Sequence, residues 1–179
     1  MSSDLQYDIT KIKSVRKEKR RPQKKKVNSR VKGNTFERKI CGLLNNRFNT
    51  KEFSRTPGSG AFASTHTLPK HLKVYGDLIC PENFRFVIEC KKGYNTENLA
   101  SIFKSNSMVW KFIKQAEKDA EFSGREPIII FKQDRSLTLA ITRKETFPET
   151  SKSIYFNKYK IDLLEDLLQF ENLYWFLPS

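Results

Sequence analysis

The run FRFVIECKKG, residues 84–93, alternates along its length in a way that predicts a β-strand. Successive side chains of a strand point to opposite faces. One face of this run is wholly apolar and should belong to the core: Phe84, Phe86, Ile88 and Cys90. The opposite face ends in Glu89 and Lys91, a carboxylate and an ammonium group on the same side of the strand.

The run GDLIC, residues 76–80, predicts a second strand just before this one, and the turn-forming residues PEN, 81–83, join the two. The two runs therefore predict a β-hairpin. In such a hairpin Asp77, near the start of the first strand, lies close to Glu89, near the end of the second.

Helical spacing of apolar residues predicts three helices. The first covers residues 34–48 and begins near Asn34, which follows Gly33 and can cap it. The second is an amphipathic helix over residues 98–122 that ends at Gly124. The third, over residues 161–170, is acidic and rich in leucine, and its apolar side suits either core packing, which we favour, or a dimer face.

Strands are also predicted at residues 127–132, 136–142 and 153–156. Residues 53–76 read as a short strand that enters a long loop rich in Gly, Ser and Thr. The order of helix, strands, helix and more strands predicts an α/β fold with a mixed central sheet flanked by helices.

Charge separates a basic arm from the rest of the chain. The net charge of the 179 residues is +14, and residues 11–32 alone hold twelve Lys or Arg and one Glu. Such a segment cannot bury enough apolar surface to order itself, so we expect an arm over residues 1–32 that is disordered when free. A polyanion is its expected partner, through bases that include Arg20, Arg21, Lys24, Lys25 and Lys26. A solubilising tail or a nuclear-import signal is the alternative. Residues 33–150 would then form the core domain, and residues 151–179 a C-terminal strand and helix extension.

Cysteine usage and hydropathy indicate an intracellular protein of the cytoplasm or nucleoid, in a microbial cell or in a host cell infected by a virus. The three cysteines lack metal-binding spacing, and the sequence shows no signal peptide. No apolar run approaches the length of a membrane span, so we expect no membrane partner.

The Asp77, Glu89 and Lys91 set favours metal-dependent hydrolysis. Two clustered carboxylates repel each other, and keeping both ionised requires a cation. Oxygen ligands suit a hard ion such as Mg²⁺ or Mn²⁺, which activates a bound water for attack on a phosphodiester. The alternative is a plain ion pair between Glu89 and Lys91 at a strand end, worth under about 1 kcal/mol.

These residues resemble the D-x(n)-E-x-K core of the PD-(D/E)XK nuclease superfamily, with Gly76 where the superfamily's name has Pro. The order of motifs over residues 32–142 is similar to that of archaeal-type Holliday junction resolvases, a group also found in viruses. The pieces that carry this resemblance are KGNTFERKI with Glu37 and Arg38, SRTPGSG with Arg55 and Ser59, and PIIIFK with Lys132. The segment between the Gly-Ser loop and Asp77 is longer here than in that group.

The resemblance implies a restriction-endonuclease-like fold and a set of roles. Glu37, Asp77 and Glu89 would hold Mg²⁺, which Mn²⁺ could replace, and Lys91 would assist the attacking water. Arg55 and Ser59 would contact the DNA backbone near the cut, and Arg38 and Lys132 would contact DNA elsewhere. The resemblance also implies a homodimer that cuts opposing strands of a four-way junction.

Two other functions stay open on the sequence. One is a different DNA nuclease of the same superfamily, such as a repair or restriction-like nickase, because junction selectivity depends on dimer geometry. The other is a non-catalytic nucleic-acid-binding protein, in which Glu89 and Lys91 form only an ion pair. Gln115, on the second predicted helix, could approach the site but is expected to be a solvated polar residue.

Overall fold

A five-stranded sheet forms the centre of the computed structural model, which describes residues 28–57 and 75–178. The strand order is β3-β4-β5-β7-β6. The strands are β3 (Phe86–Lys92), β4 (Glu126–Lys132), β5 (Thr138–Arg143), β6 (Ile154–Phe156) and β7 (Tyr159–Leu163). The β3–β4 pair is parallel and the other pairs are antiparallel, so β3 is an edge strand of a mixed sheet.

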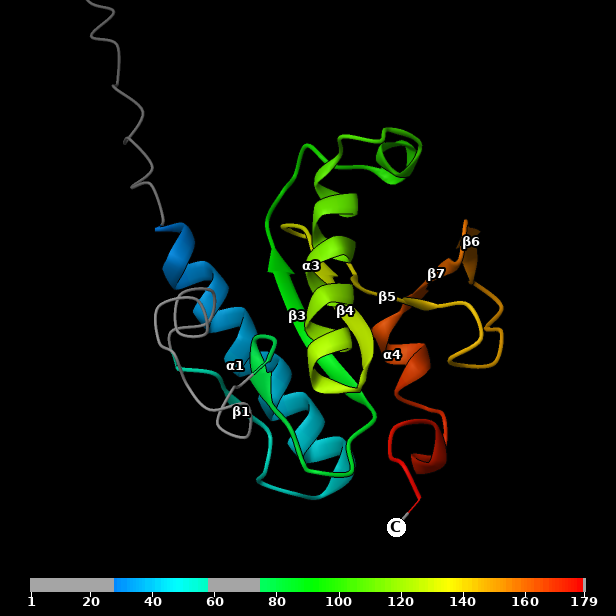
Figure 1. Ribbon diagram of the computed structural model, residues 1–179. Coiled ribbons are helices and arrows are strands. Elements are labelled where there is room, and N and C mark those ends of the chain that lie inside the picture. The colour runs from blue at the N-terminus through cyan, green and yellow to red at the C-terminus, as the bar shows by residue number, and fades with distance from the viewer. Residues whose placement is uncertain (1–27, 58–74, 179) are drawn as a thin grey trace, which may run out of the picture.

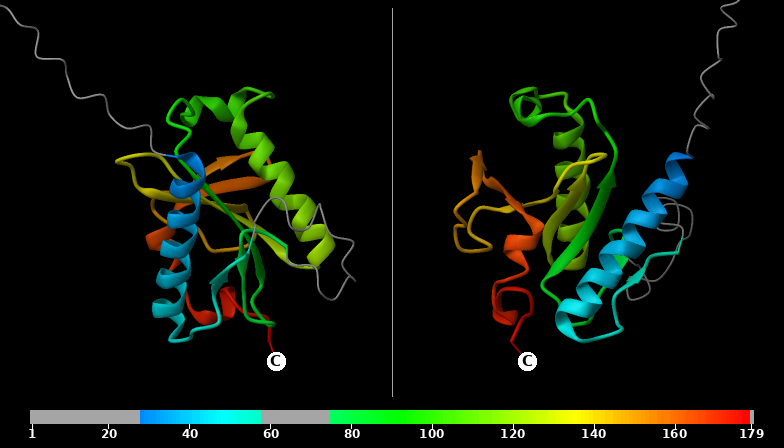
Figure 2. Two further views of the ribbon diagram at one scale, coloured as in Figure 1. Left: turned by 90° about the vertical axis from the view of Figure 1, so that its left-hand side faces the viewer. Right: turned by 180° about the vertical axis from the view of Figure 1, so that it is seen from behind.

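Two long helices cover opposite faces of this sheet, α1 (Ser29–Phe48) and α3 (Met108–Ser123), as Figures 1 and 2 show. Alternate residues of the strands supply the two cores. Ile88 and Ile130 pack with α1, whereas Ile129 and Phe131 pack with α3. The predicted α/β fold, a mixed central sheet flanked by helices, is confirmed.

The C-terminal segment completes the core on the α1 side. The short helix α4 (Leu164–Leu167) and the turn η4 (Asn172–Tyr174) bring Trp175 against Phe84, Phe86 and Phe147. Backbone hydrogen bonds run from Arg85 to Trp175 and from Leu177 to Asn83. The leucines of α4 are buried in the core, as favoured from the sequence.

The first helix begins earlier than predicted. Asn28, rather than Asn34, caps it, and its side chain accepts a hydrogen bond from the backbone nitrogen of Arg30 at 3.0 Å. Gly33 therefore lies inside α1. The first turns of this helix precede the regularly spaced apolar residues, so their pattern did not reveal them. Asn34 is left to bond to another part of the chain.

The predicted hairpin is wrong in its pairing. The strand β2 (Leu78–Ile79) pairs antiparallel with β1 (Ser54–Arg55), whereas β3 takes β4 as its ladder partner. The two runs are joined at Asp77, whose backbone nitrogen donates to the carbonyl of Ile88 at 2.8 Å. The local turn brings the two runs close together. Because both faces of β3 are buried, its other edge nevertheless pairs with β4 and joins the central sheet.

Two helix predictions need correction. Residues 98–122 divide into the 3₁₀ turn η3 (Leu99–Phe103) and α3, which ends at Gly124 as predicted, in a left-handed conformation. Residues 159–163 form β7, a strand in which Lys160 and Asp162 are buried and form an ion pair. Residues 161–163 of the helix predicted over 161–170 therefore belong to a strand, and of that range α4 covers Leu164–Leu167. Within the described residues, no helix is long and apolar enough to cross a membrane.

Candidate active site

A cleft of about 840 Å³ opens between α1, the end of β3 and α3. It brings together five of the six residues predicted to be catalytic, although they come from distant segments. The described residues of interest that line it are Glu37, Arg55, Asp77, Glu89, Lys91 and Gln115.

Asp77 is fixed on the free edge of β3. Its backbone nitrogen donates to the carbonyl of Ile88, and its Oδ2 atom accepts a hydrogen bond from the backbone nitrogen of Cys90, each at 2.8 Å. The carboxylate thus occupies backbone positions that another strand would otherwise pair with. Gly76, with φ of +73°, allows this approach, because a Cβ atom there would lie 2.6 Å from the Ile88 oxygen.

Glu89 lies beside Asp77 and is 1% exposed. Burial, and then the negative charge of Asp77, raise the pKa of Glu89 to about 8. Its Oε1 atom accepts a hydrogen bond from Lys91. Among the described residues, its Oε2 atom has no hydrogen-bond partner. One buried oxygen of this pair of carboxylates is therefore available to another ligand.

Lys91 is held between the sheet and α3. Besides its ion pair with Glu89, its Nζ atom donates to Oε1 of Gln115 at 3.2 Å and lies 5.3 Å from the centre of the Phe112 ring. Burial alone would lower the pKa of Lys91, but the Glu89 carboxylate outweighs it and raises that pKa. Lys91 therefore stays charged in the cleft, and Gln115 is one of its partners rather than a purely solvated residue.

Glu37 and Arg55 form the opposite wall of the cleft. The Arg55 Nε atom lies 2.5 Å from Oε2 of Glu37, and its Nη2 atom donates to Oδ1 of Asn34 at 3.0 Å. Pairing of β1 with β2 sets Arg55 beside Leu78, and so next to Asp77. A residue predicted to bind metal and one predicted to bind phosphate thus contact each other here.

The oxygen donors of the cleft fit a divalent cation at Asp77 and Glu89. The fit rests on the Oε2 atom of Glu89, which has no hydrogen-bond partner within residues 28–57 and 75–178, and on the crowding of two buried carboxylates, which a hard cation relieves. Across residues 28–57 and 75–178, however, no three His, Cys, Asp or Glu side chains gather closely enough to hold a metal ion. Glu37, the third predicted ligand, is directed to Arg55 instead.

Two described residues that were predicted to contact DNA do not line this cleft. Arg38 is exposed on α1 and is not among the described lining residues. Lys132 donates to the carbonyl of Ser136 at 2.6 Å and to Thr138 at 3.3 Å, away from Glu89. Several predicted residues lie outside the described residues: Ser59, Arg20, Arg21, Lys24, Lys25 and Lys26.

Three residues were not singled out as site residues from the sequence. Asn34 was taken for a helix cap but instead binds Arg55. Asp119, on α3, contributes to the field that raises the pKa of Glu89. Lys92, next to the Glu-x-Lys triplet, also lines the cleft. The position of Asp119 four residues after Gln115 was a usable signal, since both lie on one side of α3.

Comparison with known proteins identifies the class. Residues 28–171 match the family described as phage putative PDDEXK endonuclease. Because this match covers most of the chain, the chain belongs to that family and is a PD-(D/E)XK nuclease, as predicted. Nucleases of this type generally use divalent metal ions and act on DNA.

Two known proteins illustrate the similarity. The chain is 32% identical over 115 residues to Protein D14 of Escherichia phage T5, across 61% of this chain and 67% of that protein. Among solved structures it is similar to Hjc, a Holliday junction resolvase from the archaeal hyperthermophile Archaeoglobus fulgidus. That likeness has 15% identity and a TM-score of 0.36, and covers 74% of this chain and 89% of Hjc.

Proposed function

We propose that this nuclease is a metal-dependent endonuclease that cuts four-way DNA junctions, with Mg²⁺ as its ion and Mn²⁺ able to replace it. The observation that supports hydrolysis at this cleft is the buried Glu89, with one oxygen on Lys91 and the other, beside Asp77, without a hydrogen-bond partner in the described part of the chain. The order of motifs along residues 32–142 supports the junction as substrate.

In this proposal Asp77 and Glu89 hold the ion, with Glu37 as the third carboxylate of the same cleft. When bound, a divalent ion lowers the pKa of a coordinated water and stabilises negative charge on a phosphate. Lys91 keeps its proton and lowers the pKa of Glu89, though less than burial and Asp77 raise it, so a bound cation would complete the ionisation of both carboxylates. Its ammonium group also lies where a phosphate oxygen or the attacking water can accept a hydrogen bond from it.

Arg55 is proposed to hold the backbone near the cut. Its guanidinium group is already oriented by Glu37 and Asn34, so less side-chain freedom is lost when a phosphate binds. Residues of α1 around Glu37 are buried in the core, and this packing holds in place the wall of the cleft that carries Glu37 and Arg55. Ser59, which follows in the Gly-Ser loop, is proposed to contact the same stretch of backbone.

Resolution of a junction requires cuts in two opposing strands. Because the described part of one chain carries one such cleft, we propose that two copies act together as a homodimer. A nickase of the same superfamily would need a single cleft and would cut linear duplex or nicked DNA as readily as a junction. Substrate preference therefore distinguishes the two functions.

The test compares a labelled four-way junction with a linear duplex of the same sequence, each with Mg²⁺, Mn²⁺ or EDTA. We expect paired cuts in the junction with either metal and none with EDTA. Glu89→Gln should lower the rate on the order of a thousandfold, because several kcal/mol of charge stabilisation is lost. It should keep DNA affinity, because it removes negative charge.

Glu82→Gln is the matched control, since Glu82 is an exposed turn residue outside the described lining of the cleft. Equal cutting of duplex and junction would replace the resolvase by a less selective nuclease. Cutting by Glu89→Gln at the wild-type rate would refute the site itself.

A further inference from the structure

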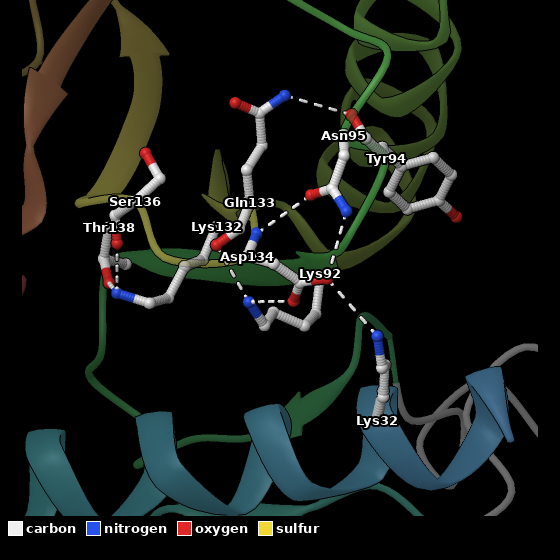
Figure 3. Close-up of polar contacts among 9 residues, drawn as sticks. All are labelled: Lys32, Lys92, Tyr94, Asn95, Lys132, Gln133, Asp134, Ser136 and Thr138. Atoms are coloured by element: carbon white, nitrogen blue, oxygen red, sulfur yellow. Dashed lines mark hydrogen bonds and ion pairs between the residues drawn. The ribbon is translucent and has the colours of Figure 1, made fainter. Parts of the chain in front are cut away.

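At one end of the cleft, nitrogen donors from three segments converge on a single carboxylate, Asp134, in the turn between β4 and β5 (Figure 3). Lys32 of α1 lies 3.3 Å from its Oδ2 atom, and Lys92 of β3 lies 2.9 Å from its Oδ1 atom. Asn95 donates to Oδ2 at 3.0 Å. Hydrogen bonds from Asn95, Lys92 and Lys32 hold the pKa of Asp134 well below its usual range.

This arrangement of donors is held by contacts that do not involve the Asp134 carboxylate. Lys92 also donates to the carbonyl of Gln133 at 2.8 Å, and Gln133 donates to the carbonyl of Tyr94 at 3.1 Å. Asn95 accepts from the backbone nitrogen of Asp134 at 2.9 Å. Figure 3 shows these contacts joining the β4–β5 turn to the segment after β3. Lys92 and Asn95 would therefore stay in place if another anion replaced the carboxylate, and Lys32, whose bond is to that carboxylate, would be free to follow the new anion.

The cluster belongs to the same cleft as the catalytic candidates. Lys32, Lys92, Asn95 and Asp134 all line it. Lys91 and Lys92 point to opposite faces of β3, as successive strand residues do, yet both line this cleft. A DNA strand that runs along the cleft past Lys91 would therefore also reach this cluster.

We propose that Lys32, Lys92 and Asn95 form a subsite for a phosphate of the DNA backbone, and that Asp134 occupies this subsite in the free protein. The proposal rests on the proposed function only in taking DNA as the ligand of the cleft. A carboxylate and a phosphate both present anionic oxygens to N–H donors. Ion pairs between groups as exposed as Lys32 and Asp134, 39% and 38%, are weak, so a phosphate can displace Asp134.

The test measures binding without cleavage. The full chain carries Glu89→Gln, and affinity for a short fluorescent duplex is measured by anisotropy in EDTA between about 50 and 200 mM salt. Asp134→Asn should raise affinity on the order of fivefold at the lowest salt, because two weak ion pairs no longer compete. It should steepen the slope of log affinity against log salt by about one, because a further counterion is released.

A variant that lacks both lysines distinguishes release of this subsite from a general effect of charge on DNA affinity. If Asp134 acts by occupying it, the gain from Asp134→Asn should vanish when Lys32 and Lys92 are both replaced by Gln. Glu145→Gln is the matched control: it removes the same charge from an exposed residue, 71% accessible, outside the described lining of the cleft. It should leave affinity within about twofold, since exposed charges beyond a Debye length are screened.

Three outcomes would overturn the subsite: an equal gain in Glu145→Gln, a gain that persists without the two lysines, or no gain at all. Asp134→Ser, which suits the same turn, should reproduce the gain, and melting temperatures of both variants confirm that they are folded. Because binding is read without cutting, a protein that gains affinity as expected but cuts no junction would contradict only the proposed function.

Discussion

Replacing Gly76 by alanine tests how the structure places Asp77. Gly76 has φ of +73°, a region that costs a residue with a Cβ atom about 1–2 kcal/mol. The added Cβ atom would also lie 2.6 Å from the Ile88 oxygen and 2.8 Å from Cγ2 of Val87. The first of these is backbone of β3, so the glycine segment itself must move.

Gly124→Ala is a matched control for the backbone strain. Gly124 has a similar φ of +69°, but an added Cβ atom meets nothing within 4 Å. We expect this control to cost about 1–2 kcal/mol, from its conformation alone. Gly76→Ala should cost about 3–4 kcal/mol, because it adds a steric clash and strains the hydrogen bond from Asp77 to Ile88.

For a domain of this size, each kcal/mol shifts the melting temperature by about 2–4 °C. Circular dichroism melts should therefore show losses of about 4 °C for Gly124→Ala and about 10 °C for Gly76→Ala. In single-turnover cutting of the junction, Gly76→Ala should lose on the order of 10²-fold in rate, since displacement of a catalytic group by about 1 Å has this effect. Gly124→Ala should cut normally. If Gly76→Ala melted at the same temperature as Gly124→Ala and cut normally, the close approach of Gly76 to the Ile88 oxygen would be refuted.

Local patterns were sufficient for the parts of the site that depend on neighbours in sequence. Alternation along residues 84–93 correctly placed Glu89 and Lys91 on one face, and their ion pair confirms it. The glycine after α3 correctly marked its end, because a left-handed residue terminates a helix. Such features are decided within a few residues, so a single sequence contains them.

Pairing between distant segments could not be read in this way. Asp77 was placed near Glu89 through a hairpin, but the contact depends on two hydrogen bonds between Asp77 and the edge of β3. That edge is free because β4 pairs on the other side, after the crossover through α3. The pairing of Arg55 with Glu37 likewise requires β1 to lie along α1. Nothing local to SRTPGSG indicates that arrangement.

Buried charge accompanies the strand that replaces the start of the helix predicted over residues 161–170. In YKIDL, residues 159–163, Lys160 and Asp162 are 0% and 1% exposed. Lys160 donates to the carbonyls of Phe147 and Pro148, so its charge is compensated inside the fold. A sequence shows the charges without their partners, and a polar position in such a run is more often solvated.

Two further predictions concern charged pairs. Arg55→Ala and Glu37→Gln should each lower the single-turnover rate, and because they share one contact the double variant should lose less than the combined losses; additive losses would show that they act separately. Glu117 accepts hydrogen bonds from Arg143 at 2.5 Å and Tyr159 at 2.7 Å. Burial alone would raise its pKa, but these bonds lower it to about 2, against 4.5 ordinarily. The folded chain therefore binds this proton less readily than the unfolded chain, so the stabilisation is complete well above pH 4.5 and is lost as the pH falls toward 2. Solvent screening reduces the stabilisation that ionised Glu117 contributes to about 1 kcal/mol, or about 3 °C in melting temperature. Glu117→Gln should show that loss at neutral pH and about half of it near pH 3, and an equal loss at both would mean that packing, not charge, makes Glu117 stabilising.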